Sequence, residues 1–248
     1  MARTAIPGRL NWLVATLAAA RVETETARTL IFDVPDWTGH MAGQHVDVKL
    51  TAEDGYSAQR SYSIASAPDG ARLELTVQRI ADGEVSPYLT DVLGPGDPLE
   101  LRGPIGGWFV WNPSATAPVL LVAGGSGIVP LMAMIRAHGA TGSKVPLRLI
   151  YSVRTPADII YASELSERSG ASPLEITYLY TRAAPQGAPT GRISADVVAR
   201  SAWPPEAKPA VFICGPTGFV ETAADLLVAA GHHPGAVKTE RFGPTGSP

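Results

Sequence analysis

The chain has 248 residues, 45% of them hydrophobic, and this length and hydrophobic content are enough for two domains with real cores. The formal net charge is −3. No basic block or stripe occurs, so we expect no nucleic-acid partner. The single cysteine, Cys214, excludes a disulfide framework and, within this sequence, a cysteine-held iron–sulfur cluster or Cys-rich zinc site. The apolar run from Trp12 to Ala20 is too short to span a bilayer, so we expect a soluble, cytoplasmic protein.

Residues 13–110 predict β structure with one short helix. Alternation of apolar and polar residues is clearest in His45–Leu50 and Leu73–Arg79. The full set of strand candidates is Leu13–Glu23, Thr29–Val34, His45–Leu50, Arg60–Ser66, Leu73–Arg79 and Leu99–Leu101. Short strands separated by glycine and proline turns favour a six-stranded antiparallel β-barrel.

One of these strands carries a cation and an aromatic ring two residues apart. Arg60 and Tyr62 fall on one face of the strand, and Ser61 and Ser63 on the other. Arginine offers a planar fork to phosphate oxygens, tyrosine a stacking face, and serine a hydrogen bond to a ring nitrogen. The set suits a ligand with phosphate and a flat ring; an ordinary edge strand with an exposed arginine is the alternative.

A helix start follows the barrel strand that ends at Arg79. In the stretch 83–89, Ser86 is placed as N-cap and Pro87 at the first helical position, and Gly94 ends the helix. The free amides of such a start can hold an anion, although a plain capped helix would have the same sequence.

From Pro118 the pattern changes to alternating strands and helices. Val119–Ala123 is a continuous apolar run, typical of a strand buried on both faces. A glycine-rich loop, 124–127, and a helical segment, Ile128–Ile135, follow directly. Strand, glycine loop and helix form a dinucleotide-binding arrangement, but the spacing is not G-x-G-x-x-G, and a tight βα turn is the alternative.

The remaining elements predict a parallel sheet with helices on both faces. Further strands are Leu147–Val153, Leu174–Tyr180, Ala210–Cys214 and Ala236–Glu240, and the helical segments are Ala157–Arg168, Ser194–Ala199 and Thr217–Ala230. We therefore expect a two-domain protein, with a barrel over residues 1–112, a linker at Pro113–Pro118 and an α/β domain over residues 118–248.

Four motifs, in this order, resemble the ferredoxin–NADP reductase superfamily over about the whole chain. They are Arg-x-Tyr-Ser at 60–63, Gly-x-x-Ser at 83–86, Gly-x-Ser-Gly-Ile-x-Pro at 124–130 and Cys-Gly-Pro at 214–216. The resemblance implies an FAD-binding barrel followed by an NAD(P)-binding α/β domain. It also implies a reductase that passes electrons to a separate protein, such as a ferredoxin or an oxygenase component, since no 2Fe-2S domain fits after Phe242.

The resemblance also assigns roles to residues. At the flavin it implies Arg60 on the pyrophosphate, Tyr62 on the isoalloxazine, Ser63 near N5, Val77 and Arg79 at the adenosine, and Gly83, Glu84, Val85 and Ser86 contacting the pyrophosphate mainly through backbone. Ser61 belongs to the same cofactor-binding set. At the pyridine nucleotide it implies Gly125, Ser126, Gly127, Pro130, Gly215, Pro216 and Thr217, with Cys214 beside the nicotinamide. Ser63, Cys214, Glu240 and Phe242 are the implied catalytic set, in which the ring of Phe242 covers the flavin.

Some alternatives stay open at this stage. Cys214 is also compatible with a buried structural thiol, and Glu240 with a surface carboxylate. FMN is the alternative to non-covalently bound FAD. A flavin or quinone reductase acting on small molecules, or a non-catalytic flavin-binding sensor module, is the alternative to a protein-dependent reductase. We expect a monomer and no metal.

Three arginines favour NADPH over NADH as the electron donor. Arg154 follows one predicted strand, Thr181 and Arg182 follow the next, and Arg192 lies a short loop further on. At the carboxyl edge of one sheet they would converge on the 2′-phosphate that distinguishes NADPH. Solvated loop charges are the alternative, and Asp158 lies four residues after Arg154.

Overall fold

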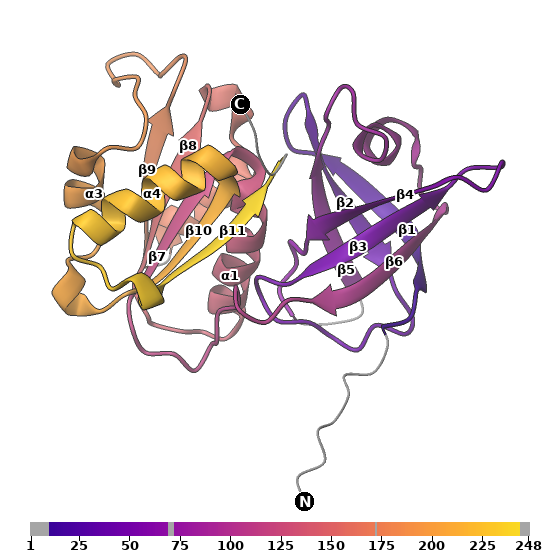
Figure 1. Cartoon of the computed structure of the whole chain (residues 1–248), viewed down its shortest axis with the longest axis horizontal. Helices are drawn as coiled ribbons and strands as arrows, with labels where there is room; N and C mark the ends of the chain where they lie inside the picture. The colour runs from indigo at the N-terminus through magenta and orange to yellow at the C-terminus, as the bar shows by residue number, and fades with distance from the viewer. Residues whose placement is uncertain (1–9, 69–71, 172, 244–248) are drawn as a thin grey trace, which may run out of the picture.

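The computed structural model describes residues 10–68, 72–171 and 173–243. Two domains lie beside each other (Figure 1), a six-stranded antiparallel sheet followed by a five-stranded parallel sheet. This confirms the predicted two-domain fold. Within the described residues, none of the helices is long and apolar enough to cross a membrane.

The first domain is a barrel built from alternating strands. Its strands are β1 (Leu13–Val22), β2 (Ala27–Asp33), β3 (His45–Thr51), β4 (Ser57–Ser63), β5 (Arg72–Gln78) and β6 (Pro98–Ile105). They pair in the order β4-β3-β6-β1-β2-β5, and a bridge between Ile64 and Leu75 brings the two edge strands together. Alternate residues such as Val46 and Val48 are fully buried inside, which leaves the outer face of each strand for ligand contacts.

The second domain alternates strands and helices around a buried sheet. Its elements are β7 (Val119–Gly124), α1 (Ile128–Ala140), β8 (Leu147–Val153), α2 (Ala162–Ala171), β9 (Leu174–Tyr180), α3 (Ala195–Ser201), β10 (Ala210–Pro216), α4 (Thr217–Ala229) and β11 (Val237–Phe242). The strands pair in parallel in the order β11-β10-β7-β8-β9. All six residues of the central strand β7 are buried, as its unbroken apolar run predicts.

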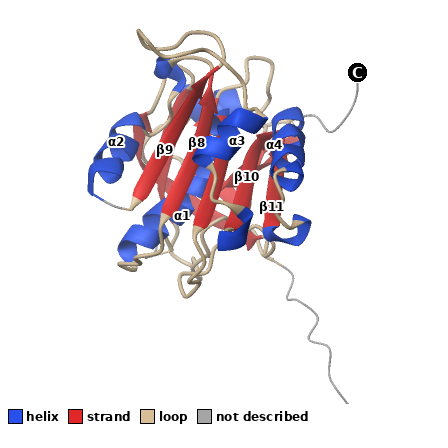
Figure 2. Ribbon diagram, turned by 90° about the vertical axis from the view of Figure 1, so that its left-hand side faces the viewer, coloured by secondary structure: helices blue, strands red, loops and turns tan. Residues whose placement is uncertain are grey.

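The helices cover both faces of this sheet. Helices α3 and α4 pack on the face away from the barrel, whereas α1 lies on the barrel side (Figures 1 and 2). The core on that side also takes in Ala27, Ala42 and Ala65 of the barrel, so the two domains share apolar contacts. Residues at the carboxyl ends of β7, β8, β10 and β11 lie near Gln78 of the barrel, because all of them line one cleft.

Among the predicted elements that differ from those in the structure, three bear on the site. The helix expected over 157–168 is instead a short 3₁₀ turn, Pro156–Asp158, and then α2, because Tyr161 adopts a left-handed backbone with φ of 63° that an α-helix cannot contain. Ser86 does not cap a helix, since its hydroxyl accepts the amide of Ile80 at 3.0 Å; a π-helical turn, Tyr88–Val92, follows. The strand expected over 60–66 runs from Ser57 to Ser63.

Candidate functional site

The barrel offers an exposed arginine beside a short loop. Nη2 of Arg60 on β4 lies 2.7 Å from Oε2 of Glu84, and the hydroxyl of Tyr56 donates to the other carboxylate oxygen at 2.7 Å. About half of the Arg60 and Glu84 side chains is exposed to solvent. Strand β4 and the 83–86 loop therefore meet at one rim, although they are more than twenty residues apart in the sequence.

The other residues of this strand divide between two surroundings. Tyr62 packs on the barrel core, and this burial raises the pKa of its hydroxyl to about 12. The hydroxyl of Ser61 donates to Asp47 at 2.7 Å, and Arg102 donates to the same carboxylate at 2.7 Å. Ser61 is thus engaged with barrel side chains on the face opposite to Arg60.

The rest of the predicted flavin set offers mainly backbone. Val77 is fully buried in the barrel and Val85 is 1% exposed, so neither side chain reaches a ligand on the outside. Arg79 pairs with Asp91 of the π-helical turn at 2.6 Å. The Gly83 amide donates to the carbonyl of Ile80 at 3.0 Å, so within this loop, which the Ser86 hydroxyl closes, the amides of 84–86 are the ones that can meet an anion.

The glycine loop after β7 is shaped by close approach. A Cβ on Gly127 would lie 2.1 Å from the carbonyl oxygen of Cys214, so only glycine fits where α1 begins against β10. Gly125 has φ of 54°, which also favours glycine. Pro130 in the first turn needs no amide partner, and the free amides of this turn point out of the helix start as an anion site.

A cleft of about 250 Å³ opens at the carboxyl ends of the parallel strands. Its lining comes from Gly124, Gly125, Ser126, Ser152, Val153, Arg154, Asp158, Ile160, Thr181, Pro216, Phe219 and Phe242 of the α/β domain, and from Gln78 of the barrel. At the start of α4, the Thr217 hydroxyl oxygen is buried and has no hydrogen-bond partner among the described residues. A cleft with a glycine-lined floor and walls from both domains can hold an elongated ligand across the domain junction.

A carboxylate and a thiol lie next to each other beneath the domain junction. Glu240 on β11 is the parallel register partner of Cys214 on β10, and its Oε1 lies 3.8 Å from Nδ1 of His45 on β3. Burial raises the pKa of Glu240 to about 7, and its Oε2 has no partner among the described residues. Burial and the Glu240 carboxylate raise the pKa of Cys214, which keeps the thiol protonated.

The structure brings together most of the predicted catalytic set. Ser63 is the register partner of His45, so Ser63, His45, Glu240 and Cys214 form a continuous series from barrel to sheet. Phe242 lies two residues beyond Glu240 and lines the cleft, 38% exposed. Of the six residues that follow Phe242, only Gly243 belongs to the described part of the chain.

The arginines predicted to read the nucleotide gather at the ends of β8 and β9. Arg154 and Thr181 line the cleft, and the amide of Arg182 donates to the carbonyl of Arg154 at 2.9 Å. Arg192 follows Gly191, whose amide donates to the carbonyl of Tyr180 at 2.8 Å. Asp158 also lines the cleft, with its Oδ2 taking hydrogen bonds from the amide and hydroxyl of Thr155.

Sequence reasoning missed His45, Gln78 and Phe219. His45 and Gln78 stand at the ends of alternating strands, where the pattern gives burial and says nothing of a partner in another domain. Phe219 packs under the glycines, since a Cβ on Gly124 or Gly215 would lie within 3.0 Å of its ring. The glycines at the ends of the two predicted strands, Gly124 and Gly215, were the sequence feature from which a nearby aromatic ring could have been predicted.

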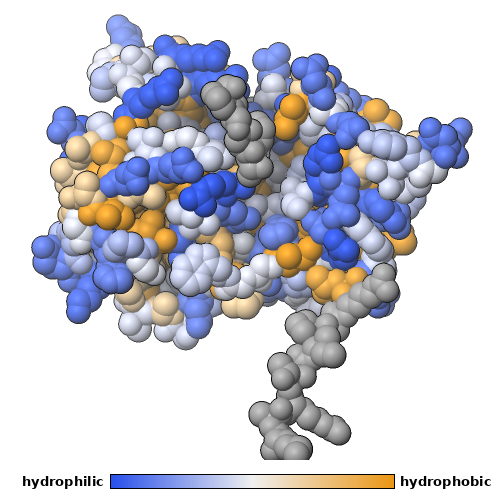
Figure 3. All heavy atoms as spheres, in the orientation of Figure 1, coloured by the Kyte–Doolittle hydropathy of each residue, from blue (hydrophilic) through white to orange (hydrophobic). Residues whose placement is uncertain are grey.

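The donor set fits the two cofactors that the motifs imply. Two of the buried polar atoms without a partner among the described residues are Thr217 Oγ1, next in the chain to the cleft residue Pro216, and Glu240 Oε2 at the domain junction. An exposed guanidinium, that of Arg60, stands at the barrel rim. The face shown in Figure 3 is largely polar, with apolar patches separated by hydrophilic residues. Backbone amides, a phosphate-binding cation and an aromatic ring are the groups that hold a dinucleotide.

Comparison with known proteins gives matches over both domains. Residues 15–110 match the family model of the oxidoreductase FAD-binding domain, and residues 121–225 that of the oxidoreductase NAD-binding domain. Ferredoxin–NADP reductase B of Sorangium cellulosum is 35% identical over 223 residues, which cover 86% of this chain and 89% of that protein. The cytochrome P450 reductase GcoB of Amycolatopsis superposes with a TM-score of 0.83 at 26% identity, over 97% of this chain and 74% of that one.

Other relatives are longer proteins. The glycine betaine monooxygenase reductase subunit of Chromohalobacter salexigens is 32% identical over 230 residues, which cover 90% of this chain and 62% of that protein. The chain thus spans about three fifths of the length of that relative. The motifs, the fold and these matches agree: the chain belongs to the ferredoxin–NADP reductase superfamily, with an oxidoreductase FAD-binding domain followed by an oxidoreductase NAD-binding domain.

Proposed function

We propose that the protein is an FAD-dependent NAD(P)H reductase that delivers its electrons to a separate redox protein. The observation that carries the proposal is the shared cleft, in which a glycine loop, Phe242 and the barrel residue Gln78 line one space. A nucleotide lying there has its phosphates at the helix start and its other end toward the barrel. When both are bound, nicotinamide supplies a hydride to the flavin, and the flavin can release electrons singly.

The chain's own residues position the reaction. Arg60 and the 83–86 backbone hold the flavin pyrophosphate, and Tyr62 supports the ring. The amides of 125–127 and the Thr217 hydroxyl hold the nucleotide phosphates. Phe242 covers the place where the nicotinamide lands and keeps water out. Glu240, with a pKa near neutrality, holds a proton at Oε1 or Oε2 beside His45, within the same junction.

Adding NADPH without oxygen to the purified yellow protein tests this proposal. We expect the flavin absorbance to bleach and to return when an acceptor is added. A protein that stays yellow would instead be a flavin-binding module without reductase activity. Heat extraction and chromatography should release FAD, and FMN alone would contradict the flavin assignment.

The acceptor is proposed to be a ferredoxin or an oxygenase component. The relatives that support this include a reductase subunit of a monooxygenase and a ferredoxin–NADP reductase. Cys214 is the only cysteine, so a cysteine-held relay inside this sequence is excluded. Turnover should be faster with ferredoxins or oxygenase components than with quinones or free flavins. The reverse ranking would favour a small-molecule reductase.

We also propose that NADPH is preferred to NADH. The support is the gathering of Arg154, Arg182 and Arg192 around the ends of β8 and β9, with Arg154 on the cleft itself. The described residues make no ion pair with any of the three, so their charges are available to a 2′-phosphate. Asp158 stands nearby, but one of its carboxylate oxygens is occupied by Thr155.

Kinetics with the two nucleotides test this preference. A charge-assisted contact of about 1.5–3 kcal/mol corresponds to a roughly ten- to hundredfold preference in kcat/KM. Arg182→Ala and Arg154→Ala should lower kcat/KM for NADPH and leave that for NADH nearly unchanged. Arg200→Ala, an exposed arginine on α3, is the matched control. A wild-type preference for NADH would contradict the assignment.

A further inference from the structure

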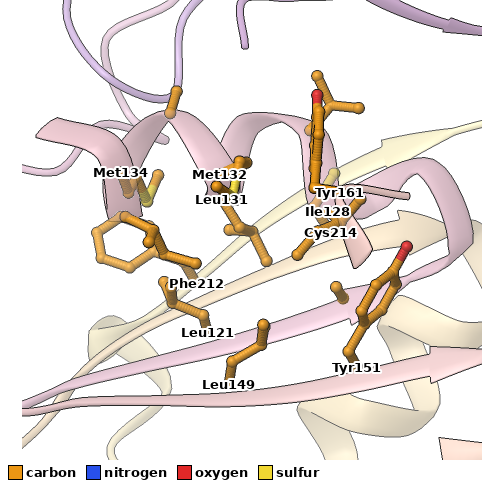
Figure 4. Close-up of a cluster of buried hydrophobic side chains, with 14 of the residues drawn as sticks. Leu121, Ile128, Leu131, Met132, Met134, Leu149, Tyr151, Tyr161, Phe212 and Cys214 are labelled. Carbon is orange, nitrogen blue, oxygen red and sulfur yellow. The ribbon is translucent and has the colours of Figure 1, made fainter. Parts of the chain in front are cut away.

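Tyr161 connects the two domains from a buried position. It belongs to the turn before α2 in the α/β domain, yet its hydroxyl donates to the hydroxyl of Thr76 on barrel strand β5. Its backbone amide donates to Oε2 of Glu23, also in the barrel, at 3.1 Å. Only 2% of the residue is exposed, and Figure 4 shows its hydroxyl directed away from the strands of the α/β sheet.

The hydrogen bonds around Tyr161 close into a ring in which every donor can be assigned. Thr29 donates to Oε1 of Glu23 at 2.7 Å, so its single proton is used. The contact of 2.8 Å between the hydroxyls of Thr29 and Thr76 must therefore have Thr76 as donor. The Tyr161 hydroxyl donates to Thr76, Thr76 to Thr29 and Thr29 to Oε1 of Glu23, and the Tyr161 amide closes the ring by donating to Oε2 of Glu23. Each hydroxyl group donates once and accepts once, except that of Tyr161, which only donates.

Arg136 reinforces the same junction. Its Nη1 donates to the carbonyl of Ala65 at 2.9 Å and to Glu74 at 2.8 Å, both in the barrel. Its Nη2 donates to Glu164 of α2 at 2.6 Å. Its guanidinium carbon lies 5.0 Å from the centre of the Tyr161 ring. One arginine of α1 thus holds both barrel and α2 while covering the aromatic ring.

The backbone of Tyr161 is strained. A φ of 63° lies in the left-handed region, which is unfavourable for a bulky side chain, and such a conformation persists where surrounding contacts fix it. The preceding amide, that of Ile160, donates to the hydroxyl of Tyr151 at 3.3 Å within the α/β domain. Adjacent amides are therefore bound to different domains, which pins this turn to both.

The turn also forms a wall of the nucleotide cleft. Asp158 and Ile160, just before Tyr161, line the cleft, and so does Gln78, two residues after Thr76 on the opposing barrel strand. The bond between Tyr161 and Thr76 therefore joins the two walls of the cleft. Without this hydrogen bond the two walls of the cleft can move apart. A nucleotide bound to the α/β domain would then lie further from the barrel.

We propose that Tyr161 is a positioning residue that fixes the width of the cleft, and so the approach of nicotinamide to the flavin, through its ring with Thr76, Thr29 and Glu23. This inference rests on the proposed reductase function. Tyr161 does not contact the reacting atoms; it acts by holding two walls in register. A misplacement on the order of 1 Å is enough to slow a reaction by about a hundredfold.

The test compares hydroxyl deletions in the full-length holoprotein. Tyr161→Phe removes the interdomain hydroxyl, and Tyr178→Phe, on β9 of the same domain, is the matched control. Anaerobic flavin bleaching at saturating NADPH should be about tenfold slower in Tyr161→Phe and unchanged in Tyr178→Phe. Flavin content should be that of the wild type in both variants. Hydrogen exchange in the nucleotide-free protein should be faster for peptides containing residues 158–161 and 74–78 in Tyr161→Phe alone.

A second pair of variants approaches the same bond from the barrel. Thr76→Val keeps the shape but loses the hydroxyl, and Thr76→Ser keeps the hydroxyl. Thr76→Val should slow flavin bleaching as Tyr161→Phe does, whereas Thr76→Ser should bleach at the wild-type rate. The double variant Tyr161→Phe/Thr76→Val should bleach no more slowly than either single variant. This pair decides the matter if Tyr161→Phe does not fold. Wild-type bleaching rates in Tyr161→Phe or Thr76→Val would overturn the inference, whereas failure of the wild type to bleach would overturn only the proposed function.

Discussion

The barrel rim and the edge of the α/β sheet present their polar groups in opposite ways. At the rim, Arg60–Glu84 and Arg79–Asp91 form pairs at 2.7 and 2.6 Å that are roughly half exposed. At the sheet edge, Thr217 and Glu240 have buried oxygen atoms without partners in the described part of the chain. Exposed pairs contribute little to stability, whereas buried unpaired groups have a desolvation cost.

Because of this difference, we expect substitutions at the rim to affect ligand binding and substitutions at the sheet edge to affect the stability of the fold. A substitution at the rim should change how well a ligand binds and leave the unfolding free energy almost unchanged. A substitution at the sheet edge should change the unfolding free energy even without ligand. The predictions below test that division, beginning with the largest effect.

Gly127→Ala should destabilise the protein most. The new Cβ would lie 2.1 Å from the Cys214 carbonyl oxygen, which belongs to a central strand and cannot move aside cheaply. We expect a loss of about 3 kcal/mol in urea unfolding, at the upper end of overpacking costs. Gly218→Ala, where nothing lies within 4 Å, is the control and should not destabilise. Equal stability of the two variants would contradict the close approach.

Arg60→Ala should release flavin without unfolding the barrel. The lost charge-assisted contact corresponds to about 1.5–3 kcal/mol, or a ten- to hundredfold higher Kd for FAD. Fluorescence titration of the flavin-free protein measures it. Arg72→Ala, which removes an exposed arginine of β5 paired with Asp33 of β2, should bind FAD as the wild type does. A large fall in the melting temperature of Arg60→Ala would contradict the expectation that substitutions at the barrel rim change ligand binding and not stability.

Glu240→Gln should change the pH dependence of stability. Burial raises the folded pKa of Glu240 from 4.5 to about 7, so the folded state binds this proton more tightly than the unfolded chain. Wild-type stability contributed by this group is therefore present below about pH 4.5 and is lost as pH rises to 7. Since a quarter of the side chain is exposed, we expect a change on the order of 1–2 kcal/mol.

The measurement is urea unfolding of both proteins at pH 5 and pH 8. The unfolding free energy of Glu240→Gln, relative to that of the wild type, should increase as the pH rises. His45 on β3, Asp47 beside it and Cys214 on β10 face this carboxylate or its neighbour. These groups are the same in both proteins, so their titration cancels to first order. An unchanged difference between the two pH values would contradict a raised pKa.

Thr217→Val should have the smallest effect of these substitutions, on stability and on binding taken together. Its buried hydroxyl oxygen has no partner among the described residues, so an apolar group of the same shape is neutral or stabilising by up to about 1 kcal/mol. Nucleotide binding should weaken several-fold if the hydroxyl meets a phosphate. Calorimetric titration with NADP⁺ measures this, and undiminished affinity would remove Thr217 from the site.

The sequence was most informative where period and spacing are local. Both β8 and β9 begin and end at the predicted residues, because apolar runs in a parallel sheet are bounded by loops. The helix predicted over 157–168 was interrupted by Tyr161, whose strained backbone is fixed by Thr76 and Glu23 of another domain. No local pattern contains that information, since the partners lie 85 and 138 residues away.

Contacts between residues far apart in the sequence also limit how much of the candidate site can be predicted. The Arg60 strand and the glycine loop carry recognisable residue types, but the contact between His45 and Glu240 depends on how two domains meet. The pairing of Ser61 with Asp47 likewise depends on the register of β3 with β4. Pairings across domains and strands therefore had to come from the structure.

The central claim is that one cleft brings nicotinamide to the flavin. Stopped-flow absorbance under anaerobic conditions, with NADPH carrying hydrogen or deuterium at the transferred position of C4, tests it most directly. We expect the flavin to bleach at a rate that saturates with NADPH concentration and falls when deuterium is transferred. A flavin-loaded protein that remains oxidised under excess NADPH and NADH would contradict it.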